Sequence, residues 1–343
     1  MKNTLLKIAT ILFLGLTLNS CSKDDSSSEP ITPTVKDVYT CGYEINGASK
    51  SVAKYWKNGI STNLSDGLQN AQARSIIVSN NDIYVAGFEF NGTKNVAKYW
   101  KNGVATPLTI STVTGFANDI AIFGTDIYVC GHIISSGTIH KACYWINGVL
   151  VNLTSSATQS SATKIVKLGN DVYVSGYVNN ATGIAVAKYW KNGIETNLSN
   201  GTNPASATDI VMSGNDVYIA GYEWNGTRSV AKYWKNGFPT NLSDGTKNAY
   251  TTSIKIQGTD IYVTGFENLE SNSQALYWKN GERFNITNGT VGGTSLDIEI
   301  FGSDIYIVGR EGSKGKLWKN NIETILNDGI FAAEVLSLFI TTN

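Results

Sequence analysis

Residues 216–237 read DVYIAGYEWNGTRSVAKYWKNG, and this phrase decides the fold. The chain of 343 residues repeats it seven times with small changes. Each copy starts with an Asp that recurs at steps of 44 or 45, and each carries a Trp near its end. The Asp residues are Asp37, Asp82, Asp126, Asp171, Asp216, Asp260 and Asp304, and the Trp residues are Trp56, Trp100, Trp145, Trp190, Trp234, Trp278 and Trp318. A repeat of this length made of short strands is typical of a β-propeller.

One repeat contains the pattern of one propeller blade. The fifth repeat predicts four short strands, at 209–213, 217–223, 230–235 and 239–243. Asn-Gly pairs at 225–226 and 236–237 separate them, and such pairs between strand-like runs are strong hairpin signals. The second strand is apolar on both faces, which is expected of a sheet packed between two others. We expect the seven Trp side chains to be buried between blades as part of the architecture.

The two ends of the repeat array predict how the ring closes. The array starts at Asp37, within a second strand, and the segment Glu334–Ile340 matches a first strand that has no second strand of its own. Joining the two removes both exposed edges. The fold class is therefore predicted as all-β: a seven-bladed β-propeller of four-stranded antiparallel blades, closed by the C-terminal strand completing blade one.

The first 36 residues follow a different pattern. Lys2 and Lys7 precede an apolar run of eleven residues, which is too short to span a membrane but suits a signal peptide. The segment ends Leu18-Asn19-Ser20-Cys21, which resembles a bacterial lipobox, although an ordinary signal with an incidental Cys would look similar. We predict a lipoprotein signal peptide at 1–20, a lipidated flexible tether at 21–36, and the propeller at 37–343.

The tether and the charge balance indicate location and exclude one class of partner. Residues 22–30 read SKDDSSSEP, which resembles the acidic tag of exported lipoproteins or a plain flexible linker. We expect a monomer anchored through the Cys21 lipid to the outer membrane and exposed at the cell surface. The chain has 27 basic and 27 acidic residues, so it lacks the positive surplus that nucleic-acid binding requires.

The repeat phrase resembles those of bacterial seven-bladed β-propeller repeat lipoproteins. The resemblance covers residues 37–343 and is carried by the Tyr-Trp-Lys-Asn-Gly phrase. In plan such proteins are akin to WD-repeat and kelch propellers, but the phrase matches neither of those signatures. No functional residue is therefore carried over from them.

The opening positions of the first strands form the candidate site. We expect them around the central channel, on the face that carries the longer loops, with Arg74 beside them. Three carboxylates and two cations at the channel mouth could hold a divalent cation or a polar ligand, or form only a solvated rim. The predicted ligand-binding residues are Arg74, Asp119, Lys164, Asp209 and Asp297.

Two further patterns have structural interpretations. Repeats one, two, five and seven carry both a Glu after the second strand and a Lys in the third, which predicts a cross-strand ion pair within each blade. His132 and His140 lie across one hairpin and could bind a transition metal, but neither has a neighbouring third ligand, so we interpret them as incidental. We predict no catalytic residues, no metal site and no cofactor.

The sequence favours a non-catalytic role. Our first hypothesis is a surface-anchored lipoprotein that acts as a binding platform for a glycan or an envelope protein. The alternative is a polysaccharide-acting enzyme, a hydrolase or lyase, in which Asp119, Asp209 and Asp297 supply acid and base at the channel mouth. A structural spacer without a ligand is the third reading.

Overall fold

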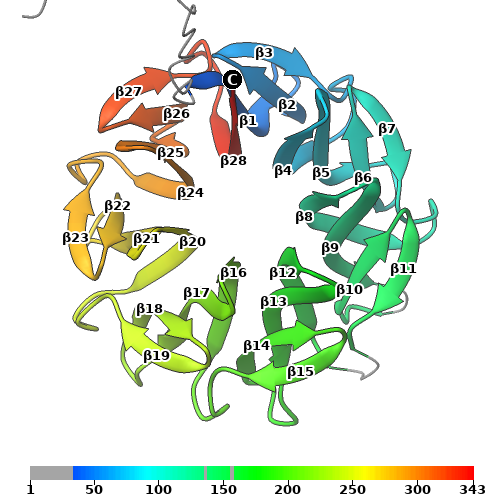
Figure 1. The fold of residues 1–343 in the computed structure, drawn as a ribbon. Helices are drawn as coiled ribbons and strands as arrows, with labels where there is room; N and C mark the ends of the chain where they lie inside the picture. The colour runs from blue at the N-terminus through cyan, green and yellow to red at the C-terminus, as the bar shows by residue number, and fades with distance from the viewer. Residues whose placement is uncertain (1–33, 135–136, 155–157) are drawn as a thin grey trace, which may run out of the picture. The chain divides into compact units, whose positions relative to one another are not determined.

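The computed structural model describes residues 34–134, 137–154 and 158–343. The expected signal peptide, the lipidation site Cys21 and nearly all of the tether lie outside the described residues. The chain divides into two units, and the unit Val35–Asn343 is a ring of seven four-stranded antiparallel sheets (Figure 1). The first strand begins at Val35, two residues before the expected start at Asp37. The predicted seven-bladed propeller is confirmed.

Each blade has an inner strand along the central channel and a second strand beside it (Figure 1). The inner strands are β28 (Ala333–Thr342), β4 (Ala71–Ser79), β8 (Thr114–Phe123), β12 (Ser160–Leu168), β16 (Ala205–Ser213), β20 (Ala249–Gln257) and β24 (Gly293–Phe301), in blades one to seven. The second strands are β1 (Val35–Ile45), β5 (Asp82–Phe90), β9 (Asp126–Ile134), β13 (Asp171–Asn179), β17 (Asp216–Trp224), β21 (Asp260–Asn268) and β25 (Asp304–Glu311).

A third strand and a short outer strand complete each blade. The third strands are β2 (Ser51–Lys57), β6 (Asn95–Lys101), β10 (Lys141–Ile146), β14 (Ala185–Lys191), β18 (Ser229–Lys235), β22 (Ser273–Lys279) and β26 (Lys314–Lys319). The outer strands are β3 (Ile60–Asn63), β7 (Val104–Pro107), β11 (Val149–Asn152), β15 (Ile194–Asn197), β19 (Phe238–Asn241), β23 (Glu282–Asn285) and β27 (Ile322–Ile325).

The ring closes in blade one, where the two ends of the propeller meet. The strand order in that sheet is β28-β1-β2-β3, with Tyr39 paired to Phe339 (Figure 1). The Asp37 amide also donates to Thr341 Oγ1 at 3.2 Å. The C-terminal strand thus completes blade one, as the repeat phase predicts, and it covers the edge that β1 would otherwise expose.

The repeated polar residues fasten one end of each blade. In blade five, Asn236 and Gly237 have φ values of 52° and 85°, as a type I′ hairpin turn requires. Asn236 Oδ1 accepts from the Val217 amide at 2.9 Å, and its Nδ2 donates to Asp216 Oδ1 at 2.7 Å. Lys235 pairs with the other oxygen of Asp216 at 2.9 Å. The Asp that opens the phrase and the Lys-Asn-Gly that ends it are therefore one interlocked unit.

The repeated Trp residues fill the spaces between blades. Trp100, for example, is 1% exposed and packs in a cluster with Tyr39 and Cys41 of the preceding blade. The described residues form seven such hydrophobic clusters. Burying a ring of this size contributes on the order of 2–3 kcal/mol. The seven Trp are thus part of the architecture, as predicted.

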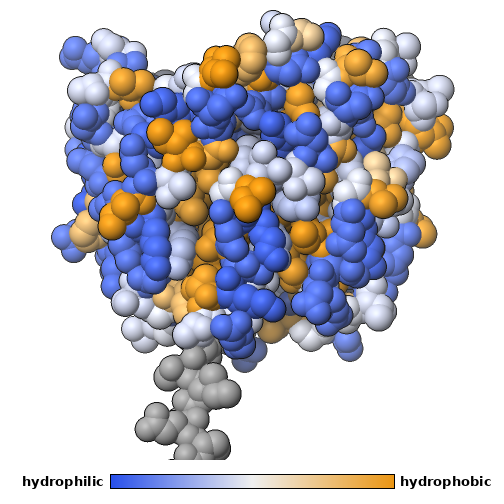
Figure 2. Space-filling model, turned by 90° about the horizontal axis from the view of Figure 1, so that it is seen from above, coloured by the Kyte–Doolittle hydropathy of each residue, from blue (hydrophilic) through white to orange (hydrophobic). Residues whose placement is uncertain are grey.

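The outer surface of the ring is mixed. Large apolar side chains are exposed singly at the starts of six outer strands: Ile60, Val104, Val149, Ile194, Phe238 and Ile322. Figure 2 shows hydrophobic side chains as separate spots among polar ones. The expected Glu–Lys pairs form in blades one, two, five and seven. The described part of the chain contains no helix that is long and apolar enough to cross a membrane.

Candidate functional site

A cavity of about 470 Å³ lies at the mouth of the central channel, and all seven inner strands contribute to its wall. Each strand contributes the residue at which its pairing register with the second strand shifts. These seven residues, which we call the bulge ring, are Arg74, Asn118, Thr163, Thr208, Thr252, Leu296 and Leu336. A β-bulge redirects a side chain and often lies beside a functional site. Each member is partly exposed, and both of its neighbours are buried except at Thr163, where Lys164 is also partly exposed.

A glycine in the second strand makes each bulge possible. Gly221 faces the bulge of β16, and a Cβ added there would run into the carbonyl oxygen of Ser206 and the ring of Trp234. Equivalent glycines meet the same carbonyl in the other blades, and they are Gly42, Gly87, Gly131, Gly176, Gly265 and Gly309. A glycine inside a strand often marks such a close approach of backbone.

The side chains of the bulge ring bind from blade to blade. Asn118 Nδ2 donates to the Ala162 carbonyl at 2.7 Å, and Thr163 Oγ1 donates to the Ala207 carbonyl at 3.0 Å. Thr252 Oγ1 donates to the Ser295 carbonyl at 2.9 Å. Each acceptor directly precedes the bulge residue of the following blade. The ring therefore supports itself over its polar arc, whereas Leu296 and Leu336 carry no side-chain donor.

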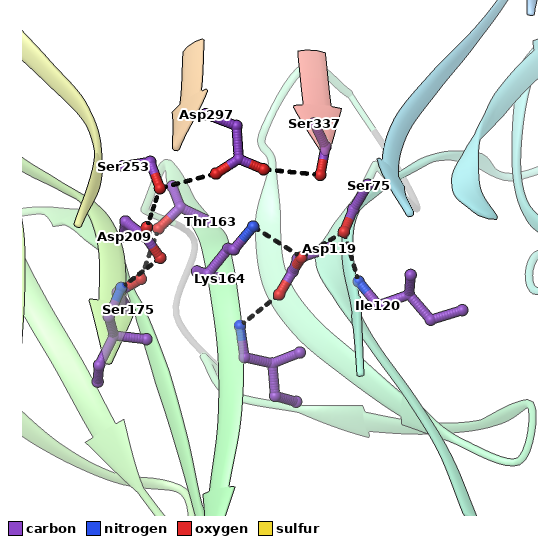
Figure 3. Close-up of polar contacts among 12 residues, drawn as sticks. Ser75, Asp119, Ile120, Thr163, Lys164, Ser175, Asp209, Ser253, Asp297 and Ser337 are labelled. Carbon is purple, nitrogen blue, oxygen red and sulfur yellow. Dashed lines mark hydrogen bonds and ion pairs between the residues drawn. The ribbon is translucent and has the colours of Figure 1, made fainter. Parts of the chain in front are cut away.

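The residue after each bulge belongs to a second ring, which we call the belt. Its members are Ser75, Asp119, Lys164, Asp209, Ser253, Asp297 and Ser337, the opening positions that the sequence singles out. Figure 3 shows their side chains linked from strand to strand. The three carboxylates are 2–4% exposed. Apart from Lys164, whose side chain is 25% exposed, the belt is therefore a buried layer next to the cavity wall.

Asp119 joins three blades within the belt. Its Oδ1 accepts from Ser75 Oγ at 2.6 Å and pairs with Lys164 Nζ at 3.1 Å, while its Oδ2 accepts from the Ile165 amide at 3.0 Å (Figure 3). Burial alone would lower the pKa of Lys164, but Asp119 and the other two belt carboxylates hold it well above its usual value. Lys164 therefore stays charged inside the ring.

Asp209 and Asp297 flank Ser253, whose Oγ lies 2.7 Å from Asp209 and 2.8 Å from Asp297 (Figure 3). Asp297 also accepts from Ser337 Oγ at 2.9 Å and from the Leu338 amide at 3.0 Å. Burial raises the pKa of Asp209. Burial would also raise the pKa of Asp297, but the positive charges of Lys164 and Lys255 outweigh this effect, so the pKa of Asp297 is lowered.

The structure separates the five predicted site residues. Arg74 lines the cavity, whereas Asp119, Lys164, Asp209 and Asp297 lie in the belt. Ligand binding by any of the five stays a prediction. Asp209 and Asp297 are neighbouring carboxylates, as a glycosidase requires, because both bind Ser253. However, Ser253 fills the space between them, where a sugar would have to lie.

Arg74 is the one cation on the cavity wall formed by described residues. Its guanidinium lies 4.8 Å from the ring centre of Phe88 and 5.3 Å from that of Phe116. Nη1 donates to Asn118 Oδ1 at 2.6 Å, and Nη2 lies 3.5 Å from Gln72 Oε1. Burial lowers the pKa of Arg74 to about 10, so the group remains charged at neutral pH.

Glu334 is the carboxylate on the same wall, and it has its own partners. Arg310 Nε pairs with its Oε1 at 3.1 Å, and Tyr43 donates to its Oε2 at 3.0 Å. Burial, followed by the charge of Glu334, raises the pKa of Tyr43 to about 12. Glu334 is thus neutralised by Arg310, and the charge of Arg74 remains in excess.

The two histidines stack on each other beside this region. Their ring centres are 4.5 Å apart and nearly parallel, and His132 Nδ1 lies 3.0 Å from Ser161 Oγ. Burial, His140 and Arg74 together lower the pKa of His132 to about 3. In the described parts of the chain, no three His, Cys, Asp or Glu side chains are grouped to hold a metal ion.

The sequence analysis missed the bulge ring apart from Arg74. A signal existed, because the repeated Gly of the second strand indicates a bulge opposite it. The residue before each belt position also changes chemically around the ring, from Arg to Asn, Thr and Leu. Variation between repeats is therefore not confined to loops, and it falls on the wall of the cavity.

No protein-family model matches the chain, and no characterised protein matches its sequence. Several solved structures share the fold. A puromycin-hydrolysing peptidase of Mycobacterium tuberculosis gives a TM-score of 0.52 at 11% identity over 86% of this chain. The β-propeller domain of the Trilobed protease from Pyrococcus furiosus gives 0.52 at 12% over 86%, and the Pyrococcus horikoshii acylaminoacyl peptidase gives 0.50 at 15% over 87%.

The coverage of these structures differs. The chain spans 52% of the length of each of the two peptidases and 96% of the isolated Trilobed protease propeller. At such identities the likeness establishes the seven-bladed fold alone.

These comparisons contradict the predicted function. The similar structures come from two peptidases and the propeller domain of a protease, and none of the three is a non-catalytic platform for a glycan or an envelope protein. The alternative of a polysaccharide-acting enzyme at the channel mouth fails too. Its three carboxylates are buried and each accepts a hydrogen bond from a backbone amide of the next blade, so they have no access to a sugar chain.

Proposed function

We propose that this propeller serves peptide hydrolysis by receiving a peptide segment at its channel mouth. The observation that carries the proposal is the asymmetric cavity that the bulge ring builds on a peptidase-like fold. Its volume of about 470 Å³ is in the range of small-molecule sites, so it suits one or two residues of a peptide.

The chemistry of the wall suits a peptide. A peptide offers amide donors, carbonyl acceptors and apolar side chains within a few ångströms. The bulge ring offers hydroxyl and amide groups from Asn118 to Thr252 and apolar carbons at Leu296 and Leu336. The polar arc and the apolar arc lie on different parts of the wall. A bound peptide is therefore oriented, with its amide and carbonyl groups at the polar arc and its apolar side chain at the leucines.

A retention experiment tests this function. The full chain is immobilised and incubated with a chymotryptic digest of casein, and bound peptides are identified by mass spectrometry. We expect the native protein to retain a subset of peptides and Leu336→Trp, which fills the mouth, to lose them. Val149→Trp places the same bulk on the exposed start of β11 and serves as the control. Absence of retained peptides, or equal retention by Leu336→Trp, would contradict the proposal.

The site of action is a separate proposal. We propose that a lipid on Cys21 anchors the chain to the outer membrane, on the strength of the lipobox-like Leu18-Asn19-Ser20-Cys21. Intact-mass analysis of the membrane fraction tests it, with Cys21→Ser as the comparison. We expect the diacylglyceryl mass on the native chain and none on Cys21→Ser; an unlipidated native chain would refute the anchor.

A further inference from the structure

We propose that Arg74 binds the C-terminal carboxylate of a peptide whose last side chain is apolar. This inference rests on the proposed function for its choice of a peptide, and it adds which end of the peptide is bound and by which group.

Arg74 is charged at neutral pH and has no counter-ion among the described residues. Within the described chain no carboxylate lies within ion-pair distance of its guanidinium, while Arg310 and Tyr43 already engage Glu334. Its polar partners there are the neutral side chains of Asn118 and Gln72. A guanidinium has five N–H donors in a planar fork, and a carboxylate is its matching bidentate acceptor.

The position of Arg74 is also fixed before any ligand arrives. Phe88 and Phe116 pack against the guanidinium, and the bond to Asn118 sets its direction. A side chain that is already ordered loses little entropy on binding, which favours affinity. Blades three to seven and blade one have no Arg or Lys at the equivalent bulge position, so this cation is a single feature of a repeated scaffold.

The apolar residues of the wall are neighbours of Arg74 around the ring. Leu336 of blade one precedes Arg74 of blade two, and Leu296 of blade seven precedes Leu336. A carboxylate held at Arg74 therefore has the apolar arc on one side. An α-carboxylate carries its own side chain one bond away, so an apolar last residue can reach this arc.

The backbone of the same arc offers acceptors. In the polar arc, bulge side chains donate to the carbonyls of Ala162, Ala207 and Ser295. The equivalent carbonyls next to the leucines belong to Val335 and Ala73, and a leucine cannot donate to them. A peptide N–H beside the terminal carboxylate can take the place of that donor. This requirement distinguishes a peptide end from a simple organic acid.

Calorimetric titration of the full chain with three probes tests the inference. The probes are N-acetyl-glycyl-leucine, its C-terminal amide, and N-acetyl-aspartyl-glycinamide, which carries its carboxylate on a side chain. We expect the free acid to bind at least about tenfold more tightly than the other two, since a charge-assisted bidentate contact is lost in the amide. Equal affinity for acid and amide, or tighter binding of the aspartyl probe, would overturn it.

Variants assign the effect to Arg74. Arg74→Gln should abolish the preference for the acid, Arg74→Lys should retain part of it, and Arg228→Gln, an exposed arginine in the β17–β18 hairpin, should leave it unchanged. Thermal melts show whether each variant is folded. If Arg74→Gln does not fold, Arg74→Lys still tests the assignment, because its preference for the acid should be weaker than that of the native chain. A preference that survives in Arg74→Gln would contradict the assignment.

The outcomes separate this inference from the proposed function. If the digest yields retained peptides that bind equally as acids and amides, the carboxylate site is wrong and the function stands. If no peptide is retained while N-acetyl-leucine binds through Arg74, the site stands and the function is wrong.

Discussion

Thr208 and Asp209 are adjacent in strand β16, yet they belong to two rings with opposite properties. Thr208 is a bulge residue, partly exposed on the cavity wall, and the seven bulge positions carry four residue types, Arg, Asn, Thr and Leu. Asp209 is 3% exposed and is bound to Ser253 and to the Ile254 amide of the next blade. The comparison shows that two adjacent positions of the repeat have different roles. The belt holds the blades together, and the side chains of the bulge ring vary from blade to blade.

The largest effect is expected from removing the strand that closes both rings. Deleting Glu334–Asn343 removes β28 and with it Val335 and Leu338, which are buried in the core of blade one. It also removes two of the donors to Asp297. We expect the cooperative urea transition followed by circular dichroism to be lost. A truncated chain that melts at the native temperature would show that closure contributes nothing.

The next largest effect is expected in the belt. Asp297→Ala should lower the free energy of unfolding by about 3 kcal/mol or more, because it removes a buried carboxylate and leaves its buried donors, Ser253, Ser337 and the Leu338 amide, without their acceptor. Urea denaturation measures the loss. Leu296→Ala, one residue earlier, is the matched control and should cost far less, since its side chain is partly exposed. Equal losses at the two positions would erase the distinction between the rings.

A pH-dependent effect is expected at His132, beside the mouth. Its pKa is lowered to about 3 in the folded protein, against about 6.5 when unfolded. Between these values the unfolded chain binds more protons, so this residue makes stability fall as the pH decreases below about 6.5. At pH 4.5 the loss should reach roughly 2–3 kcal/mol.

His132→Phe isolates that contribution, because Phe88 and Phe266 occupy the equivalent position in blades two and six. Unfolding free energies at pH 7 and 4.5 should differ less in this variant than in the native chain. The belt carboxylates are present in both proteins, so their contribution to the pH dependence of the unfolding free energy is the same in both and cancels. An unchanged difference would mean that water reaches His132 freely.

The smallest effect on stability is expected in the bulge ring. Leu296→Thr introduces the residue that blades four, five and six carry at this position, so the free energy of unfolding should change by less than about 1 kcal/mol. The same change should alter which peptides the chain retains. A loss of more than about 2 kcal/mol in denaturant titrations would show that the bulge ring is structural like the belt.

The fold could be predicted because the sequence repeats with a nearly constant period. Seven copies of a phrase whose Asp recurs at steps of 44 or 45, with a leftover first strand at Glu334–Ile340, define the blades and their closure. The belt positions were found for the same reason. The burial of the belt residues could not be predicted. It depends on how closely the inner strands approach one another across the channel, and no local sequence pattern indicates that distance.

The candidate site escaped prediction for a different physical reason. A bulge shifts pairing by one residue and so moves the next side chain from one face to the other. Strict alternation, counted along β16, cannot reveal that Thr208 points to the cavity and Asp209 between the blades. The strand glycine Gly221 is the local trace of this shift, but its meaning is clear only when the carbonyl of Ser206 is seen against it.

The closure in blade one also sets the order of events during synthesis. Asp37 and Thr341 bond across 304 residues of chain, so β1 must wait for nearly the whole polypeptide. At about 5–20 residues per second, the inner edge of β1 stays unpaired for roughly 15–60 s. An open edge recruits other strands, and the nascent chain is therefore most prone to aggregation before β28 emerges.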